Sequence, residues 1–399
     1  MPKVDKIRSE VDEIMPGMVA DRRHLHENPE LGFQEFKTAE FVKQRLEQLG
    51  VEDIRTGIAV TGVTGLVTGT ADGPNRNVLV RADMDALPIL EENDVDYKSK
   101  NDGVMHACGH DAHTSILLGL ARLLTDRKDQ FSGTVKLCFQ PAEELPPGGA
   151  QAMIKEGVMN EPPIEAVFGL HMANQVPVGK IQVGAGPVMA AADGYTITIH
   201  GKGGHGAYPH GCIDPVVVGA QIVVALQTAV SRNTDPMDAA VVSNCVFQSG
   251  DAFNVIPDTA VLKGTVRTFK DETRDLMEKR ITELATTIAE GMGAKATVDY
   301  SRGYPATVND EAMTELARES AIAAVGEENV IPKDPAMGAE DMSYFQLEAP
   351  GSYFFVGSKN EEKGLVWGHH HPKFDIDEES MANGLTAMAM NVLTYLGRD

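Results

Sequence analysis

The chain has 399 residues, of which 42% are hydrophobic and 23% are charged, and its formal net charge is −23. This length and composition predict a soluble globular protein with two domains. The negative charge excludes nucleic acid as an expected partner, because two polyanions repel each other.

The first part of the chain predicts alternating helices and strands. Apolar residues at helical spacing cover 4–25 and 36–49, and Gly50 ends the second helix. Strands buried on both faces are expected for the short apolar runs NVLVRADM (77–84), GTVKLCFQ (133–140) and EAVFGLHM (165–172). Helices are expected between them, in TSILLGLARLL (114–124) and AQAMIKEGV (150–158). This order predicts an α/β fold with a mostly parallel sheet and helices on both faces.

The pattern changes near residue 187, where strands with one exposed face begin. The expected order is a strand (195–201), a helix (214–230), two strands (239–250 and 259–269), a helix (271–291) and a strand (296–304). This β-α-β-β-α-β order is the split arrangement of a small α+β domain. Helices and a strand of the first kind return after Asn309. We therefore predict a domain of residues 187–305 that is inserted into a larger domain of residues 1–186 and 306–399.

The compartment is inferred from the N-terminus, the cysteines and the longest apolar run. The stretch MPKVDKIRSEVDEIM has no apolar core of a signal peptide, and the four cysteines show no paired spacing. The run VVVGAQIVVALQTAV (216–230) is interrupted by Gln and is expected to be too short and too polar to span a bilayer. These features predict a cytoplasmic protein without a membrane partner.

Polar side chains follow each predicted strand of the larger domain. Asp83 and Asp85 follow the first strand, Glu143 and Glu144 follow the second, and His171 ends the third. The segment HACGH (106–110) lies in the loop before a helix, and HHHP (369–372) lies near the C-terminus. Because the carboxyl ends of parallel strands face the ligand crevice of such a sheet, these groups are expected to converge.

A thiolate, imidazoles and carboxylates would be costly to bury together without a cation. A divalent metal accepts all three ligand types, and the number of candidates suggests two ions. Within the glutamate pair, one side chain can bind metal while its neighbour serves as general base, but spacing alone does not order Glu143 and Glu144. Cys108 as a nucleophile, with His110 or His113 as its base, is the alternative from the residues alone. His113 is otherwise expected to pack in the first turn of its helix.

These segments belong to a longer series of motifs that resembles a known family. The series is RRHLHENPELGFQE, VLVRADMDALPI, MHACGHDAHT, FQPAEE, GLHM, GKGGHGAYPH, IDPV, FNVIPD, GTVRTF, GAEDMSYF and HHPKFDIDEE, in order between residues 22 and 379. It is similar to the aminoacylase, hippurate hydrolase and auxin-conjugate hydrolase branch of the dimetal amidohydrolases and peptidases. The resemblance covers nearly the whole chain.

The resemblance implies a site for two divalent ions, zinc or manganese, with cobalt or nickel as further options. Matched by motif, the implied ligands are Cys108, His110, Glu144, His171 and one C-terminal histidine. We assign that last ligand to His370, two residues before Pro372, and His369 and His371 stay open. Glu143 is the implied acid and base, while Asp83 and Asp85 are expected behind the ligands, orienting them.

The family also implies roles for the inserted domain, which would have a ferredoxin-like fold and mediate a homodimer or a higher homo-oligomer. His205 would reach the partner's site and help to hold the oxyanion. Asn254 and Arg267 would bind the substrate, and an Arg grips a carboxylate with two hydrogen bonds.

The expected function is hydrolysis of the amide bond of a small-molecule N-acyl amino acid, by a metal-activated water with Glu143 as base. The alternatives are a dipeptidase or carboxypeptidase of the same family, a thiol amidohydrolase that uses Cys108, and a non-catalytic N-acyl amino acid binding protein.

Overall fold

The computed structural model describes residues 3–397, which divide into two compact units. The first unit comprises Met1–Val188, Val308–Asp334 and Asp341–Asp399, and the second comprises Met189–Thr307 and Pro335–Glu340. The short segment Pro335–Glu340 thus packs with the second unit, although the sequence analysis assigned these residues to the larger domain. The segments that pass between the units contain two short paired strands, β7 (Gly186–Met189) and β14 (Thr307–Asn309).

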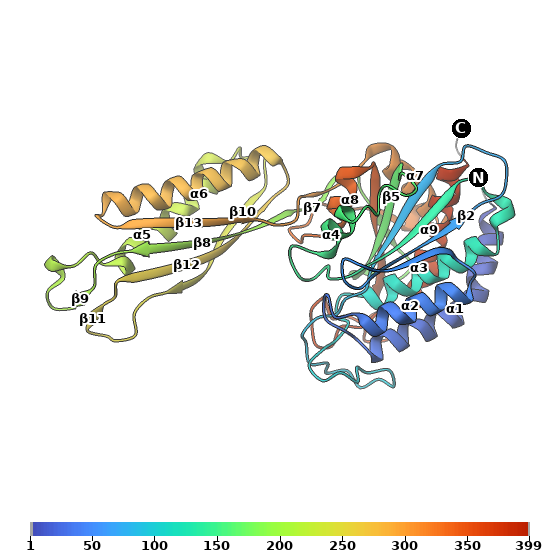
Figure 1. Cartoon of the computed structure of the whole chain (residues 1–399), viewed down its shortest axis with the longest axis horizontal. Coiled ribbons are helices and arrows are strands. Elements are labelled where there is room, and N and C mark those ends of the chain that lie inside the picture. The colour runs from blue at the N-terminus through green and yellow to red at the C-terminus, as the bar shows by residue number, and fades with distance from the viewer. Residues whose placement is uncertain (1–2, 398–399) are drawn as a thin grey trace. The chain divides into compact units, whose positions relative to one another are not determined.

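The first unit contains an eight-stranded sheet with the order β1-β2-β4-β3-β5-β16-β6-β15. Figure 1 labels strands β2 and β5 of this sheet, together with the helices of the unit. Its central strands β4, β3, β5 and β16 run parallel to one another, whereas β1, β2 and β6 pair antiparallel at the two sides. The strands are β1 (Glu52–Ile58), β2 (Gly62–Thr68), β3 (Asn77–Asp83), β4 (Thr134–Gln140), β5 (Ala166–Pro177), β6 (Ile181–Val183), β15 (Val330–Pro332) and β16 (Gly351–Lys359).

Helices of the first unit cover this sheet in two groups. In one group, the helices contact one another and the sheet. Its members are α1 (Val4–Glu27), α2 (Phe36–Gln48), α3 (His110–Thr125), α7 (Glu311–Val325) and α9 (Ser380–Leu396). The other group consists of α4 (Gly149–Lys155) and α8 (Met342–Glu348), which contact each other and strands β4, β5 and β16. The predicted α/β class with a mostly parallel central sheet is confirmed.

The second unit is built from one antiparallel sheet with the order β10-β12-β8-β13 and from two long helices. Its elements are β8 (Ala191–His200), β9 (Gly204–His205), α5 (Pro215–Thr228), β10 (Ala240–Gln248), β11 (Val255–Ile256), β12 (Thr259–Thr268), α6 (Asp271–Gly291) and β13 (Lys295–Arg302). With the small β9-β11 pair set aside, this is the β-α-β-β-α-β order and strand arrangement of a ferredoxin-like fold, as predicted.

Helix α5 is more apolar than the other helices of this unit. Together with the turn that follows, it spans Pro215–Asn233 and is long and apolar enough to cross a bilayer by length and composition, which the sequence analysis did not expect. Its side chains Val218, Ile222 and Leu226 are fully buried in the core of the second unit. Other apolar side chains of the same helix, Val216, Val217 and Val224, are exposed.

Candidate metal centre

Three neighbouring parallel strands bring the predicted ligand segments to the same edge of the sheet. In the ladder between β3 and β4, Asp83 lies opposite Gln140, three residues before Glu143. In the ladder between β3 and β5, Arg81 lies opposite Gly169, two residues before His171. The carboxyl ends of the three strands therefore lie next to one another, as the sequence analysis expected.

Gly109 allows the ligand pair on either side of it to turn into the site. Its φ is 93°, in the left-handed region that residues with a Cβ rarely adopt. A Cβ at this position would also lie 3.1 Å from the Cβ of Met172. The chain therefore needs glycine between Cys108 and His110, where helix α3 begins.

The candidate ligand atoms form two overlapping groups that share Cys108. In one group Cys108, His110 and His171 bring their ligand atoms within 4.8 Å of one another, and in the other Cys108, Glu144 and His370 do the same. Cys108 Sγ lies 3.6 Å from His171 Nε2, and Glu144 Oε1 lies 3.1 Å from His370 Nε2. The structure thus brings together all five side chains that the sequence analysis proposed as ligands.

The chemistry of these donors fits a divalent cation. Nε2 of His110 is buried, has no hydrogen-bond partner among the described residues and lies 3.9 Å from Glu144 Oε1. Burial lowers the pKa of His110, but Asp83 and the other carboxylates around the ring raise it to about 10. Burial and the carboxylates of Glu144 and Glu143 raise the pKa of the Cys108 thiol well above its usual value. Both pKa shifts reflect an excess of negative charge around these side chains. Bound metal ions would supply the positive charge that balances it.

Hydrogen bonds to the far ring nitrogens aim the imidazoles at this centre. Nδ1 of His110 lies 2.9 Å from the carbonyl oxygen of Asp85 and 3.2 Å from its carboxylate, which also accepts the backbone N–H of Glu144. Nδ1 of His171 donates to the carbonyl oxygen of Met172. Both rings therefore keep Nε2 for a metal ion, which is the usual arrangement of histidine ligands.

His113 lies behind the centre, in the first turn of α3. Its Nδ1 lies 2.6 Å from Asp83 Oδ1, and its Nε2 accepts the backbone N–H of Met172. Because both ring nitrogens are engaged by these groups, His113 connects the end of β3 to the end of β5. Asp83 also pairs with Arg81 at 2.7 Å.

The three consecutive C-terminal histidines point in different directions. His370 has a φ of 63°. Of the three histidines, it is the one whose ring nitrogen lies in a candidate metal group among the described residues, together with Cys108 and Glu144. His369 is half-buried and lies against the ring of His171, with 5.1 Å between ring centroids. His371 stacks on Trp367 at 4.2 Å. This geometry favours the assignment of the ligand to His370.

Glu143 is placed beside the ligands rather than among those around Cys108. It is 7% exposed, and its carboxylate lies within 4.8 Å of the nearest ligand atoms of His110 and Glu144. Among the described residues, the two groups that contain Cys108 do not include Glu143. Glu143, His110 and Glu144 themselves form a candidate metal group, so the role of Glu143 as general base stays a prediction.

The predicted substrate residues lie at opposite ends of the second unit. His205 on β9 pairs with Val255 on β11, and Gly206 donates its N–H to the carbonyl oxygen of Asn254, so His205 and Asn254 are close together. Arg267 lies near the other end of β12 and donates to the carbonyl oxygens of Met337 and Val266. Arg267 lies eight positions after Thr259 on this extended strand, which corresponds to about 27 Å. The structure therefore does not bring Arg267 together with His205 and Asn254 within this unit.

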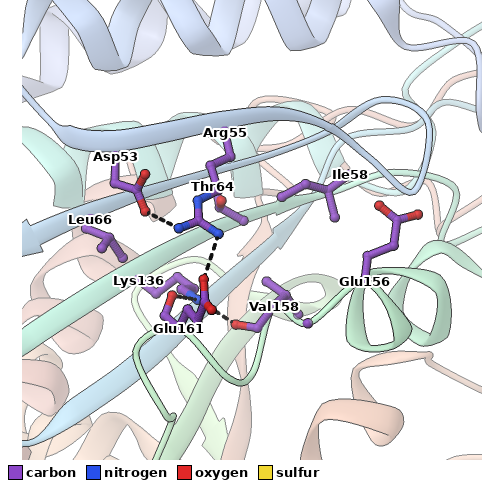
Figure 2. A pocket seen from close by; sticks show the side chains of 10 residues that line it. Asp53, Arg55, Ile58, Thr64, Leu66, Lys136, Glu156, Val158 and Glu161 are labelled. Atoms are coloured by element: carbon purple, nitrogen blue, oxygen red, sulfur yellow. Dashed lines mark hydrogen bonds and ion pairs between the residues drawn. The ribbon is translucent and has the colours of Figure 1, made fainter.

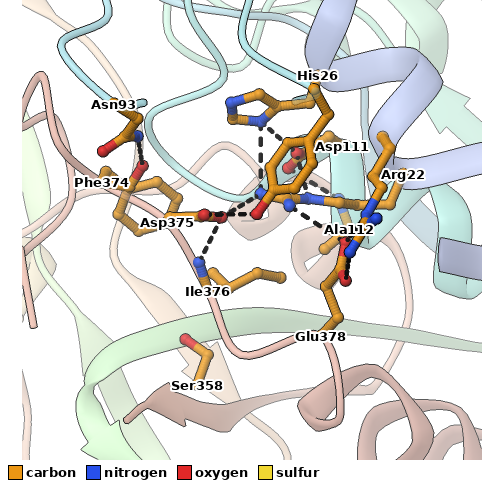
Figure 3. Close-up of polar contacts among 12 residues, drawn as sticks. Arg22, His26, Asn93, Asp111, Ala112, Ser358, Phe374, Asp375, Ile376 and Glu378 are labelled. Atoms are coloured by element: carbon orange, nitrogen blue, oxygen red, sulfur yellow. Dashed lines mark hydrogen bonds and ion pairs between the residues drawn. The ribbon is translucent and has the colours of Figure 1, made fainter. Parts of the chain in front are cut away.

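A buried ionic network anchors two ligand segments to helix α1 (Figure 3). Arg22 is fully buried and donates to Asp111 at 2.8 Å and to Asp375 at 2.6 Å. His26 lies 2.7 Å from the same Asp111 carboxylate, and although burial raises it, the pKa of Asp111 is held well below its usual value by Arg22 and His26. Asp111 follows the proposed ligand His110, and Asp375 lies five residues after His370.

Sequence reasoning missed this network and a second buried carboxylate, Asp341. Asp341 accepts hydrogen bonds from Arg81 and Gln140 and from the backbone of Ala150. The sequence does contain a signal for one contact of this region, the ion pair of Arg81 with Asp83. These residues are two positions apart on a strand, so their side chains share a face. The partners from distant segments gave no local signal.

A separate charged pocket of about 30 Å³ lies against β1, β2 and β4 (Figure 2). The buried Lys136 ammonium donates to the carbonyl oxygens of Val158 and Glu161, and Arg55 pairs with Asp53 and with the Glu161 carboxylate. These contacts fasten the loop before β5 to the sheet, which is a structural role.

Comparison with known proteins identifies the class to which this fold and centre belong. The model of Peptidase family M20/M25/M40 matches residues 79–393. N-acetyl-L-cysteine deacetylase of Bacillus subtilis (strain 168) is 42% identical over 91% of this chain and 84% of its own length. IAA-amino acid hydrolase ILR1-like 4 of Arabidopsis thaliana is 41% identical over 95% of this chain and 86% of its own length.

A solved structure agrees with these sequence relatives. Bacillus subtilis YxeP, described as a dinuclear metal-binding peptidase from the M20 family, matches with a TM-score of 0.84 at 36% identity, covering 96% of this chain and 99% of that chain. The chain therefore belongs to peptidase family M20/M25/M40, and it is a hydrolase that acts on amide bonds. The resemblance drawn from its motifs is confirmed.

Proposed function

We propose that this protein is a metal-dependent amidohydrolase that splits N-acyl amino acids into a carboxylic acid and an amino acid. The observation that carries the proposal is the gathering of Cys108, His110, Glu144, His171 and His370 at one sheet edge, with Glu143 beside them. The two named relatives support the substrate class, because an N-acetylcysteine deacetylase and a hydrolase of IAA-amino acids both act on acylated amino acids.

The five ligand side chains would hold two divalent ions, zinc or manganese, with cobalt or nickel as further options. When bound, such ions lower the pKa of water and polarise a carbonyl group. Glu143 then takes a proton from the attacking water and passes it to the nitrogen of the departing amino acid. His205 donates a hydrogen bond to the oxyanion that develops on the acyl carbon.

A second copy of the chain would complete this site. His205 and Asn254 lie near the start of β12, and Arg267 lies about 27 Å further along this strand from Thr259, so we infer that one small substrate does not contact both ends of one unit. We propose a homodimer in which one copy supplies His205 and Asn254 and the other supplies Arg267. A dimer formed through the inserted unit and a cytoplasmic location both stay predictions.

The first experiment separates the proposed base from its neighbour. Glu143→Ala is expected to lower turnover of an N-acyl amino acid at least about 100-fold, because general bases contribute about that much. Bound metal, measured by elemental analysis, should stay near the wild-type value. Glu144→Ala is the matched control and should lose metal together with activity. Equal metal loss in both variants would contradict the assignment of the two roles.

The second experiment tests the reaction class with a panel of acetyl, benzoyl and indoleacetyl amino acids. Turnover is measured after chelation and after return of zinc, manganese, cobalt or nickel. Loss with chelator and recovery with metal is the expected result. Activity that survives chelation but not alkylation would indicate a thiol hydrolase, and binding without turnover would indicate a carrier.

A further inference from the structure

The turn after β4 holds the two glutamates in a backbone conformation that needs support. Ala142, directly before Glu143, has a φ of 53° and is fully buried. An alanine in the left-handed region is strained and persists only where the surroundings hold it there. The direction in which Glu143 and Glu144 leave the chain depends on this residue.

Two buried carboxylates take the backbone N–H groups of this turn. Oε1 of Glu35 accepts the N–H of Ala142 at 2.8 Å, and Oδ2 of Asp85 accepts the N–H of Glu144 at 2.9 Å. The other oxygen of Glu35 accepts the hydroxyl of Thr61 at 2.6 Å. Glu35 is completely buried, so water does not compete for these bonds.

The segment that carries Glu35 is itself fixed against the site. The carboxylate of Glu30 accepts the N–H groups of Lys37 and Thr38 and thereby caps helix α2. A Cβ on Gly32 would lie only 3.0 Å from the Cβ of Ala142, so this segment packs directly on the turn. Glu35 therefore reaches Ala142 from a segment that is hydrogen-bonded to helix α2 and packed on the turn.

We propose that Glu35 is a positioning residue of the reaction: it holds the Ala142 peptide so that Glu144 points to the metal ligands and Glu143 stays beside them. This inference rests on the proposed function and adds a residue from the N-terminal segment to it. Glu35 acts through the backbone of Ala142 and has no contact with the proposed ligands in these hydrogen bonds.

Two uncharged variants of similar size separate the hydrogen bond from the charge. Glu35→Gln can still accept the Ala142 N–H and donate to Thr61, whereas Glu35→Met fills the space without any acceptor. Glu35→Met is expected to lower kcat at least tenfold with KM within twofold and bound metal unchanged. Glu35→Gln should stay within threefold of the wild type. Thr61→Val, which removes the other hydrogen bond only, should also keep most of kcat.

Hydrogen–deuterium exchange provides a readout that does not depend on activity. In the metal-free protein, the peptide that covers residues 141–145 should exchange faster in Glu35→Met than in Glu35→Gln. If Glu35→Met does not fold, Gly32→Ala takes its place, because its added methyl group presses on Ala142 without removing a hydrogen bond. That variant should then lower kcat at least fivefold at normal metal content.

The proposal is overturned if Glu35→Met keeps kcat within twofold, if both Glu35 variants lose activity equally, or if activity falls only in step with bound metal. An unchanged kcat in Gly32→Ala would overturn it as well. A wild-type protein without any turnover of N-acyl amino acids would instead contradict the proposed function, so the two failures are distinguishable.

Discussion

At the scale of single residues, the site depends on carboxylates that are placed behind the ligands. Asp85 receives the backbone N–H of Glu144 and faces Nδ1 of His110, so one side chain orients two proposed ligands. Loss of such an outer partner usually weakens metal binding about 10–100-fold.

We therefore expect Asp85→Ala to raise the dissociation constant for zinc or manganese by about 10–100-fold. Titration of the metal-free protein with metal measures this change directly. Asp102→Ala, at an exposed loop position, is the control and should leave the affinity unchanged. An Asp85→Ala protein with wild-type affinity would show that the two hydrogen bonds do not tune the ligands.

Glu35 also predicts a pH dependence of stability. Burial raises the pKa of Glu35 to about 7, so the folded metal-free protein holds a proton that the unfolded chain releases near pH 4.5. The free energy of unfolding should fall as pH rises from about 4.5 to about 7, by up to about 3 kcal/mol from this group.

Glu35→Gln has no proton to lose and serves as the test. Urea unfolding of the metal-free wild type and variant at pH 5 and pH 8 should show the variant gaining about 2–3 kcal/mol relative to the wild type at the higher pH. A stability difference that is the same at both pH values would mean that Glu35 titrates normally.

At the scale of secondary-structure elements, helix α1 is tied to the site by the network around Arg22. Arg22 is fully buried and pairs with Asp111 and Asp375, while its neighbour Arg23 is exposed and pairs with Glu378. Removal of a buried partner leaves uncompensated charge, whereas an exposed ion pair contributes little.

Arg22→Met is expected to lower the free energy of unfolding by about 3–5 kcal/mol, because Asp111 and Asp375 lose their buried partner. Arg23→Met is the matched control on the same helix and should change it by less than about 1 kcal/mol. Chemical denaturation measures both. If both variants lose a similar free energy of unfolding, the burial of the Arg22 ion pairs does not determine how much they stabilise the fold.

Much of the element order could be predicted, because the central strands are buried on both faces and the helices have clear apolar periodicity. The run 133–140 predicted β4 at Thr134–Gln140, and the pattern over 271–291 predicted α6 with its observed bounds. Strand β1 had no such signal, because most of its side chains are exposed at the edge of the sheet. The glutamate pair and His171 could be located because they follow buried strands. The segments with Cys108, His110 and His370 follow no such strand, and their motifs pointed to them.

The supporting residues of the site could not be predicted in the same way. Glu35 lies 107 positions before Ala142, and Arg22 lies 353 positions before Asp375, so only the fold brings these partners together. The directions in which Glu143 and Glu144 leave the chain depend on the left-handed Ala142, and an alanine in the sequence does not reveal that conformation.

At the scale of the whole molecule, the proposed homodimer contains one complete site for each pair of His205 and metal centre from different copies of the chain. Mixing Glu143→Ala with His205→Ala should therefore restore activity, because a mixed dimer contains one site with both residues intact. Random exchange predicts about one quarter of wild-type activity, since about half of the dimers are mixed. Subunit exchange followed by an activity assay measures this, and each variant alone should stay inactive. No recovery after verified exchange would exclude action of His205 in trans.

The central claim is that amide hydrolysis needs metal ions held by Cys108, His110, Glu144, His171 and His370. The most direct test is to strip the protein of metal and to measure bound metal and hydrolysis of an N-acyl amino acid together as zinc or manganese is returned. We predict no turnover in the stripped protein and a rise to full activity as about two ions bind per chain. Full activity in protein shown to contain no metal would contradict the account.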